Sequence, residues 1–582
     1  MDPTQIEVLR NRLEALGDGM ALTLARSSRS TIVRVALDFS TGVLGPSGEL
    51  LAQGLCQPIH LGGMPPALAA CLEHYQERIY PGDVLINNDP YEGGSHLPDV
   101  FLYKPVFLNG VCLSYLCAMT HYPDMGGRIA GSSACDSTEI YQEGLRIPPL
   151  KLFEEGKPNE AIFRILEKAV RVPELVLGDL QANLAALRYG ERELMGLVSM
   201  YGVEELQDQI EGLLAYTEEA TRAAIRSLPD GAWQFTDYVS DDSIEIKPIP
   251  IVVNLTKSGD SLSFDFTGTG PQAKGAINPP FVTTKALVYA AVKSALGTLG
   301  HDIPNTGGYF RPIEITAGLG SFANPLPPAA VTARNVGGIR IFQAVLGAFA
   351  QMLPDRIPAC TGGCENHHNW FGYDKSQLPW KAWVSGELHN EVAGGAFPDR
   401  NGFDAQGCGS TNVANIPIEQ LEAEYPLRVE RYGILADREG AGKYRGGVGM
   451  VRTYRLLADD VLLQMRTDRR TYPPYGLQGG QASAPSQILL NPGTPEEELL
   501  PTKFVRTLSK GDVLELRYPG GGGWGDPLEH DSQQVIEDVL AEKITLERAR
   551  EVYGVVVDQG GRGADVPATV QLRRSLGRPQ KT

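Results

Sequence analysis

The sequence predicts a multidomain α+β protein that is rich in β-structure and contains a helical insertion. Segments in which apolar and polar residues alternate, as they do in strands, lie on both sides of a region with helical spacing. The strand-like segments do not alternate regularly with single helices, which argues against a βαβ succession. A chain of 582 residues is also long enough for several domains of about 150 residues each.

The first part of the chain combines helices with antiparallel strands. Apolar residues recur every three or four positions over 4–28, which predicts an opening helix. Alternation over 32–57 predicts a pair of strands, and a further helix is expected over 65–75. Asn109-Gly110 then indicates the turn of a second hairpin, because this dipeptide suits the tightest hairpin turns.

The remainder of the chain changes its pattern several times. Helical spacing dominates 158–228, and two more helices are expected over 281–296 and 335–353 within a region rich in Gly and Pro. Short strands dominate 380–526, and a single helix over 531–553 precedes a tail. We therefore expect an α+β domain over 1–157, a helical segment over 158–230, an α+β domain over 231–379, a β-rich domain over 380–530, and a C-terminal helix with a tail over 531–582.

The charge of the chain limits its partners. With 52 Lys and Arg against 70 Asp and Glu, the formal charge is −18, which argues against nucleic acid or an anionic membrane surface. The apolar stretches are shorter than the roughly 18 residues that span a bilayer, and the first residues show no secretory signal. The eight Cys residues are scattered and form no disulfide framework. We therefore expect a cytoplasmic protein that binds neither nucleic acid nor membrane.

Two copies of one pattern, His-x-Pro-Asp, stand beside strand-like segments. They are His96-Leu97-Pro98-Asp99 and His121-Tyr122-Pro123-Asp124. Imidazole and carboxylate together suit Zn²⁺, Mn²⁺ or Fe²⁺, and Asp38 is a further carboxylate that interrupts an apolar strand. The alternative is a turn in which the aspartate accepts backbone hydrogen bonds and the histidine only packs. The spacing leaves both interpretations open.

Other polar groups are weaker candidates for a site. His60 stands in an apolar stretch, which suits a core position or a place behind a metal ligand. Glu143 and Arg146 are three residues apart and are either an active-site pair or an ordinary ion pair. The chain has no G-x-x-x-x-G-K-[S/T] motif for binding nucleotide phosphates. A reaction that consumes nucleotide would therefore need a site on another chain.

Four motifs, in order along the chain, resemble the signatures of the hydantoinase B family. The resemblance extends from about residue 4 to residue 555. That family includes the B subunits of ATP-dependent hydantoinases, 5-oxoprolinases and lactamases such as caprolactamase, together with related subunits of acetone and acetophenone carboxylases. The four motifs are Asn88-Asp89-Pro90-Tyr91-x-Gly93-Gly94-Ser95-His96-Leu97-Pro98-Asp99, Gln142 to Pro149, Arg445-Gly446-Gly447-Val448-Gly449, and the glycine run from Pro519 to Pro527.

The resemblance implies a division of labour between two kinds of subunit. A hydantoinase A-type subunit with an actin-like ATPase fold phosphorylates the substrate, and the B-type subunit completes the reaction at one divalent metal ion. Zn²⁺ and Mn²⁺ are the leading candidates for that ion, with Fe²⁺ as a third. The two subunits are expected to form an (αβ)2 hetero-oligomer. Matching positions make 1–157 the metal-binding domain and assign the ligands to Asp38, His96, Asp99 and His121.

The reaction that the resemblance favours is ATP-dependent hydrolysis of a small cyclic amide, such as a hydantoin, 5-oxoproline or caprolactam. ATP would bind to the partner subunit, and phosphorylation of the amide oxygen would supply a leaving group. The catalytic candidates on this chain are His60, Asp124 and Glu143, of which the first two would relay a proton from behind the ligands. One alternative is a subunit of an acetone- or acetophenone-type carboxylase, which would use bicarbonate. Another is a non-catalytic scaffold for the ATPase subunit.

Overall fold

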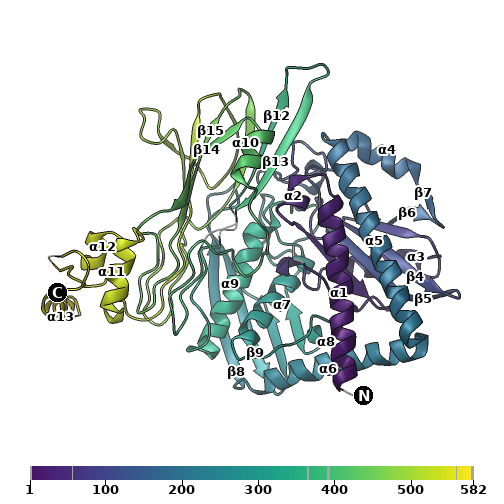
Figure 1. The fold of residues 1–582 in the computed structure, drawn as a ribbon, viewed down its shortest axis with the longest axis horizontal. Coiled ribbons are helices and arrows are strands. Elements are labelled where there is room, and N and C mark those ends of the chain that lie inside the picture. The colour runs from purple at the N-terminus through teal and green to yellow at the C-terminus, as the bar shows by residue number, and fades with distance from the viewer. Residues whose placement is uncertain (1–2, 56, 364–365, 390–392, 559, 578–582) are drawn as a thin grey trace.

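The computed structural model describes residues 3–55, 57–363, 366–389, 393–558 and 560–577. Among these residues the strands form four sheets, and helices pack against the first two (Figure 1). The predicted α+β, multidomain class is therefore confirmed. None of the helices in the described ranges is both long and apolar enough to cross a membrane. The predicted cytoplasmic location stays a prediction.

The N-terminal unit is built on a seven-stranded sheet in the order β2-β1-β5-β4-β3-β6-β7. All of its neighbouring strands pair in the antiparallel sense, and the tight turn at Asn109-Gly110 joins the two longest strands as predicted. The strands are β1 (Phe39–Leu44), β2 (Leu50–Gln53), β3 (Val84–Asn87), β4 (Asp99–Leu108), β5 (Val111–His121), β6 (Leu150–Glu154) and β7 (Lys157–Pro158).

Helices cover both faces of this sheet because its strands are apolar on both sides. Val100 and Leu102 share a core with α1 (Pro3–Ser27) and α5 (Pro173–Tyr201). Phe101 and Tyr103 face the other way, towards α3 (Met64–Tyr75). The segment predicted to be helical is therefore part of the first core. The other helices of this part of the chain are α2 (Thr31–Arg34), η1 (Pro58–His60), η2 (Ile140–Gln142), α4 (Glu160–Ala169) and α6 (Val203–Arg226).

The second unit packs two long helices on a four-stranded sheet in the order β11-β10-β9-β8. Both helices were predicted within two residues of their observed ends. One of them, α9 (Arg334–Met352), is buried at every residue except Gln351. The other elements are β8 (Gly231–Val239), β9 (Ile249–Ser258), β10 (Ser261–Asp265), α7 (Phe281–Gly297), α8 (Gly307–Phe310) and β11 (Ile313–Thr316).

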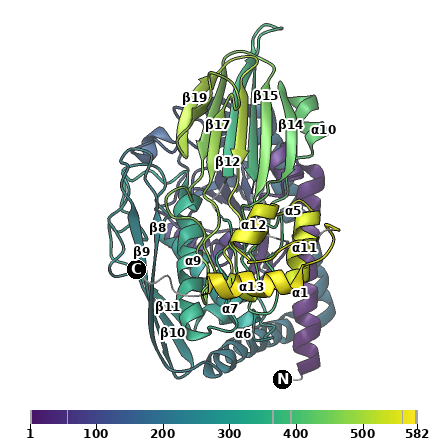
Figure 2. The ribbon, with the colours of Figure 1, turned by 90° about the vertical axis from the view of Figure 1, so that its left-hand side faces the viewer.

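The third unit is a β-sandwich, in which sheet β13-β12-β16-β19 packs on sheet β14-β15-β20-β17-β18 (Figure 2). Trp370 and Leu463 from one sheet and Tyr454 and Leu516 from the other fill the space between them. Its first hairpin lies on both sides of the predicted boundary at residue 379. The elements are β12 (Asn366–Asp374), β13 (Lys381–His389), α10 (Ile418–Glu424), β14 (Leu427–Ile434), β15 (Met450–Leu456), β16 (Val461–Arg466), β17 (Gln487–Leu490), β18 (Glu498–Leu499), β19 (Lys503–Leu508) and β20 (Val513–Arg517).

Buried ion pairs join α9 to the sandwich. The guanidinium of Arg340 donates to Asp468 at 2.9 Å from Nε and 2.7 Å from Nη2, and it lies 3.4 Å from Asp237 on β8. All three side chains are buried. Removing one partner from such a group leaves an unpaired buried charge, which typically costs about 3–5 kcal/mol. The network therefore fixes the segment that follows β16 against α9 and β8 of the second unit.

The C-terminal region differs from its prediction in two places. The single helix expected over 531–553 is divided, because Glu542 adopts a φ of 57° and Thr545 caps a new helix. The expected tail contains another helix, and Arg573 on it donates to the carbonyls of Tyr553 and His530. Residues 578–582 of that tail lie outside the described residues. The elements here are η3 (Pro527–Glu529), α11 (Ser532–Leu540), α12 (Leu546–Glu551) and α13 (Val566–Leu576).

The glycine run at 520–523 is tightly packed against other backbone segments. A Cβ at Gly521 would lie 1.9 Å from the carbonyl oxygen of Gly394, and one at Gly522 would lie 2.0 Å from that of Tyr475. Only glycine permits such close approach of one backbone to another. The glycine run is therefore a place where several backbone segments pack directly against one another.

We expect Gly521→Ala to lower the free energy of unfolding by about 1–3 kcal/mol, because the new methyl group would collide with the backbone at Gly394. Calorimetric melting of the purified chain measures this loss. Gly433→Ala is the matched control, since a Cβ on that β14 residue meets nothing within 4 Å. Equal melting temperatures for the two variants would contradict the packing argument.

Candidate metal centre

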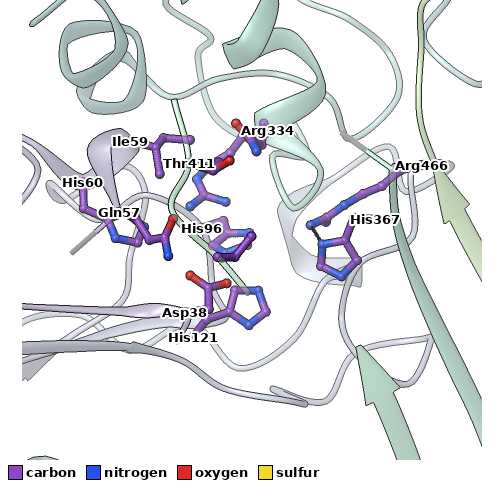
Figure 3. Close-up of a pocket in the computed structure, with 12 residues that line it drawn as sticks. Asp38, Gln57, Ile59, His60, His96, His121, Arg334, His367, Thr411 and Arg466 are labelled. Carbon is purple, nitrogen blue, oxygen red and sulfur yellow. Dashed lines mark hydrogen bonds between the residues drawn. The ribbon is translucent and has the colours of Figure 1, made fainter. Parts of the chain in front are cut away.

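A small polar cavity of about 40 Å³ lies where the three units meet (Figure 3). Each unit supplies part of its wall, so the cavity exists only in the assembled chain. Water-sized cavities need about 10–15 Å³, so this one has room for a small ion and its coordinated groups. The wall is formed by Asp38, Gln57, Ile59, His60, His96, His121, Arg334, Asn335, His367, Thr411, Val413 and Arg466.

The pairing of β4 with β5 brings the two predicted motifs together. Asp99 is the first residue of β4, His121 is the last residue of β5, and the two are paired directly across the strands. His96 precedes β4 in a turn that the amide of Asp99 closes on the His96 carbonyl at 3.0 Å. One ligand atom from each of these three buried residues lies within 4.8 Å of the others. This group could therefore hold a divalent ion.

The donor atoms of the group fit a metal because the protein leaves them without hydrogen bonds. Both ring nitrogens of His121, Nε2 of His96 and Oδ1 of Asp99 are buried and have no hydrogen-bond partner among the described residues. His96 Nε2 and Asp99 Oδ1 are 3.1 Å apart but are not aligned for a hydrogen bond. Buried polar atoms are almost always satisfied. A cation bound by two imidazoles and a carboxylate would satisfy one nitrogen of each ring and Oδ1 of Asp99.

Neighbouring groups orient His96 and keep it neutral. Its Nδ1 lies 2.8 Å from the carbonyl oxygen of Thr332, so Nδ1 carries the proton and Nε2 presents its lone pair to the cavity. Burial and the nearby Arg334 guanidinium lower the pKa of His96 to about 4. Burial and the adjacent His96 ring hold the pKa of His121 well below its usual range. Both rings are therefore ready to coordinate without first losing a proton.

Asp99 is held in its ionised form. Burial alone would raise its pKa, but the protonated form of His96 and the permanent charge of Arg334 hold that pKa well below its ordinary value. Oδ2 accepts from Arg334 Nη2 at 2.6 Å and from the hydroxyl of Ser95. These two donors occupy Oδ2 and leave Oδ1, which lies 3.1 Å from His96 Nε2, without a hydrogen-bond partner among the described residues. Asp99 is thus oriented in the way that metal-binding carboxylates are, through hydrogen bonds to the oxygen that does not coordinate.

Asp38 borders the same cavity just before β1. Its carbonyl accepts from the amide of His121 at 3.1 Å, which ties its backbone to the end of β5. The preceding Leu37 has a φ of 60°, so the chain turns sharply before the carboxylate. The three-residue group above does not include Asp38. Its place as a fourth ligand stays a prediction.

His60 lies on η1 and faces Asp99. Its Nδ1 is 2.9 Å from the hydroxyl of Ser40, and its Nε2 is 3.7 Å from Asp99 Oδ2. Burial lowers the pKa of His60 to about 3, against the opposing attraction of Asp99 and with further help from Arg334 and His96. The ring is therefore neutral at physiological pH. Its role in proton transfer stays a prediction.

Asp124 does not line the cavity, although it belongs to the second copy of the motif. Its carboxylate accepts from the amides of Gly131 at 2.9 Å and Arg171 at 2.7 Å, and from the Arg171 guanidinium at 3.2 Å. It follows the end of β5, whereas Asp99 begins β4, so identical local patterns place their carboxylates in different surroundings. The structure gives Asp124 contacts that fix loops, and nothing in it tests a catalytic role.

Glu143 also lies outside the cavity but connects to it through one peptide. Its Oε1 accepts from the amides of Val331 and Thr332, each at 2.8 Å. Burial raises the pKa of Glu143 to about 8, although these two amides oppose the rise. The Thr332 carbonyl in turn accepts from His96. Glu143 therefore fixes the turn that orients a candidate ligand, and its catalytic role stays a prediction.

Three further wall residues were not among the predicted site residues. His367 on β12 has Nε2 3.0 Å from Asn369 Oδ1, and its Nδ1 accepts from the guanidinium of Arg466. Arg466 also donates to the Thr332 carbonyl at 3.2 Å. Arg334, at the start of α9, binds Asp99 as described. These residues lie more than 200 positions from the motifs, and no local spacing connects them with His96 or His121.

Fold and cavity together define a multidomain α+β chain in which two histidines and an aspartate could hold a divalent ion. The profile of the Hydantoinase B/oxoprolinase family matches residues 2–527, so the chain belongs to that family. The resemblance that the four motifs predicted is therefore confirmed.

Relatives include single subunits and longer chains. The sequence is 32% identical to a protein of Pseudomonas sp. (strain NS671) that is provisionally named as the B-type component of a D-/L-hydantoinase, over 99% of this chain and 98% of the relative. It is 30% identical to 5-oxoprolinase 1 of Arabidopsis thaliana, over 90% of this chain but 42% of the plant protein. The plant enzyme thus contains a matching region within a chain more than twice as long.

Two solved structures share the fold. The ATP-dependent caprolactamase from Pseudomonas jessenii superposes with a TM-score of 0.91 and 29% identity, over 99% of this chain and 100% of that chain. A nucleotide-free acetone carboxylase superposes with a TM-score of 0.90, over 99% of this chain and 83% of that chain. Its identity is only 18%, so this second likeness shows the fold alone.

We expect His121→Ala to abolish metal binding, because it removes a buried ligand that has no other partner. Elemental analysis by mass spectrometry should find about one divalent ion per wild-type chain, as a single closed site requires. The control is His74→Ala, which removes an exposed histidine outside the cavity. Full metal content in His121→Ala would contradict the assignment.

Glu143→Ala should weaken metal affinity by about tenfold or more, as the loss of a group that orients a ligand usually does. Glu143→Gln should remain near wild type, since its amide oxygen can still accept from both backbone amides. Competition with a chromophoric chelator measures the affinities. If alanine and glutamine variants bind the metal equally well, Glu143 does not orient His96.

Proposed function

We propose that this chain is the metal-binding B-type component of an ATP-dependent cyclic amide hydrolase. In this proposal a separate hydantoinase A-type ATPase subunit phosphorylates a hydantoin, 5-oxoproline or lactam, and this chain completes ring opening. The observation that carries the proposal is the group formed by His96, Asp99 and His121, whose buried donor atoms have no hydrogen-bond partner among the described residues. It occurs in a chain that belongs to the Hydantoinase B/oxoprolinase family.

The chemistry explains why both ATP and a metal would be needed. An unstrained cyclic amide is a poor electrophile, and phosphorylation of its oxygen supplies a leaving group. A divalent ion, Zn²⁺ or Mn²⁺ with Fe²⁺ as a third candidate, would act as a Lewis acid on the substrate or its attacking water. In this proposal His60, whose Nε2 lies 3.7 Å from Asp99 Oδ2, would accept a proton from that water. The hydrogen bonds from Arg334 to Asp99 Oδ2 and from His96 Nδ1 to the Thr332 carbonyl would leave Asp99 Oδ1 and His96 Nε2 for the ion.

Two observations support a partner subunit. The sequence has no phosphate-binding loop of the G-x-x-x-x-G-K-[S/T] type, so ATP would bind elsewhere. Two relatives of similar length are named as subunits, and the longer plant 5-oxoprolinase contains more than this region within one chain. We propose an (αβ)2 hetero-oligomer with the ATPase subunit.

The test is ring opening by the chain after co-purification with its ATPase partner. Hydantoin, 5-oxoproline and caprolactam are each supplied with ATP, and the ring-opened product is measured by mass spectrometry. We expect one of them to be opened only with ATP. His121→Ala should abolish the reaction in an intact complex, and His74→Ala should leave it unchanged.

Labelled bicarbonate separates this proposal from a carboxylase. A cyclic amide hydrolase leaves no label in its product, whereas an acetone- or acetophenone-type carboxylase incorporates it. Lasting incorporation would overturn the proposal in favour of that second reaction. Turnover that survives His121→Ala while assembly changes would instead indicate a scaffold.

A further inference from the structure

A second pocket, of about 230 Å³, lies between α7, α9 and the loops over 357–361, 394–397 and 406–409. An apolar cavity of about 150 Å³ is large enough for benzene, so this pocket can enclose a ring of five to seven atoms. The metal cavity, at about 40 Å³, cannot enclose such a ring by itself. A cyclic amide therefore has more room here than beside the candidate metal ligands.

The floor of this pocket is apolar and its rim is open to solvent. Phe342 and Leu346 of α9 and Ile357 after it are buried, and they line the pocket together. Ser294 of α7 and Gln406 also line it, and both are exposed. Pockets for small molecules are usually lined by apolar side chains with a few polar groups that fix the orientation of the ligand. This pocket has that composition and can be entered from outside.

Two polar side chains in the wall of the pocket complement an amide. The hydroxyl oxygen of Thr361 accepts hydrogen bonds from Gln343 Nε2 at 2.9 Å and from the amide of Gly363 at 3.3 Å. Both of its lone pairs are then used, and neither hydrogen bond uses the hydroxyl proton, which can donate to a carbonyl oxygen. Gln406 on the rim carries an amide oxygen that can accept from a ring N–H.

The wall of the pocket favours an uncharged ligand. None of its described lining residues is Asp, Glu, Lys, Arg or His. A carboxylate placed there would lose hydration without gaining a cationic partner, which is unfavourable. Lactams and hydantoins carry no charge at neutral pH, whereas 5-oxoproline carries a carboxylate. The pocket therefore suits a lactam or a hydantoin better than 5-oxoproline.

The same helix and the same loop form part of both the pocket and the metal cavity. Asn335 lines the metal cavity, and Phe342 lines the pocket. These residues are seven positions apart on α9, so they lie on the same side of the helix and about 10 Å apart along its axis. The loop over 406–413 borders both spaces, with Gly409 at the pocket and Thr411 at the metal cavity. A ligand in the pocket would thus lie near the candidate metal centre.

We propose that this pocket is a recognition site for an uncharged cyclic amide with a ring of five to seven atoms. The apolar floor contacts the ring carbons, Thr361 donates to the carbonyl oxygen, and Gln406 accepts from the ring N–H. This inference rests on the proposed function, which makes a cyclic amide the substrate, and it narrows that substrate to a lactam or a hydantoin. Thr361 and Gln406 bind the amide and take no part in holding the metal.

The test is a titration of the purified full chain with three ligands, followed by ligand-detected NMR, without ATP or the ATPase subunit. The matched pair is γ-butyrolactam and 5-oxoproline, because they share a five-membered lactam ring and differ only in the carboxylate. The third ligand is caprolactam, which has a seven-membered ring. We expect saturable binding of both neutral lactams. The affinity for 5-oxoproline should be lower by about tenfold or more, since its carboxylate finds no cation in the wall.

Ser294→Trp should block the pocket, because an indole at its rim would take the space that the ring needs. Lactam affinity should fall by about tenfold or more, since the clash excludes the ligand. Ser199→Trp is the matched control. Ser199 is also an exposed residue near the end of a helix, and its hydroxyl donates to the carbonyl four residues earlier at 2.8 Å, as that of Ser294 does at 2.9 Å. This control changes α5 and should bind lactams like the wild type.

Thr361→Val removes the hydroxyl with little change in shape. It should weaken lactam binding by about threefold to tenfold, the usual effect of losing one hydrogen bond. Thr361→Ser keeps the hydroxyl and should bind lactams like the wild type. The melting temperature of each variant shows whether it remains folded.

The His121→Ala variant separates the pocket from the metal centre. It should bind lactams as the wild type does, because His121 belongs to the wall of the metal cavity. Loss of lactam binding in this variant would place the ligand at the metal cavity and overturn this inference, while the proposed function would stand.

Three other results would also overturn the inference and leave the proposed function standing. They are the absence of saturable lactam binding by the folded wild-type chain, unchanged binding in Ser294→Trp, and binding of 5-oxoproline as tight as that of γ-butyrolactam. Failure of ATP-dependent ring opening beside a normal lactam titration would instead overturn the proposed function.

Discussion

The carbonyl of Thr332 is the point at which the three units of the protein are joined around the cavity. It accepts hydrogen bonds from His96 of the first unit and from Arg466 of the sandwich. The amide of the same residue, Thr332, donates to the carboxylate of Glu143. A carbonyl oxygen has two lone pairs, and both are used here. Moving this single peptide would break the hydrogen bonds to the candidate ligand His96 and to the Arg466 guanidinium together. The orientation of the candidate metal ligands thus depends on a backbone group more than 200 residues away from them.

That peptide is itself held by the larger interface between units. Thr332 lies two residues before α9, and Arg466 ends a strand two residues before Asp468. The ion pair between Arg340 and Asp468 therefore sets the distance between the helix and the strand. Because such buried pairs tolerate little misplacement, they favour one docking geometry over many looser ones. The position of the sandwich then determines where His367 and Arg466 meet the cavity.

The sequence could predict those site residues that lie within a short recognisable motif. His96, Asp99 and His121 fall in short motifs next to a recognisable hairpin, and the strand register then brings them together. Asp124 shares the pattern but occupies another environment, because which way a side chain faces depends on where its strand ends. Arg334 and Arg466 carry no local signal, since their meaning comes from tertiary contacts between distant segments. Tertiary contacts also explain why the helix at 566–576 was not predicted. Its local pattern is weak, and the hydrogen bond from Arg573 to the carbonyl of Tyr553 stabilises it.

Because the cavity wall comes from segments far apart in the chain, the cavity cannot form until most of the chain has been synthesised. The three candidate ligands are complete once residue 121 is made, but the groups that orient them arrive with residues 332 and 466. The complete wall around the candidate ligands can therefore form only after the chain has been made as far as Arg466 and the sandwich has docked.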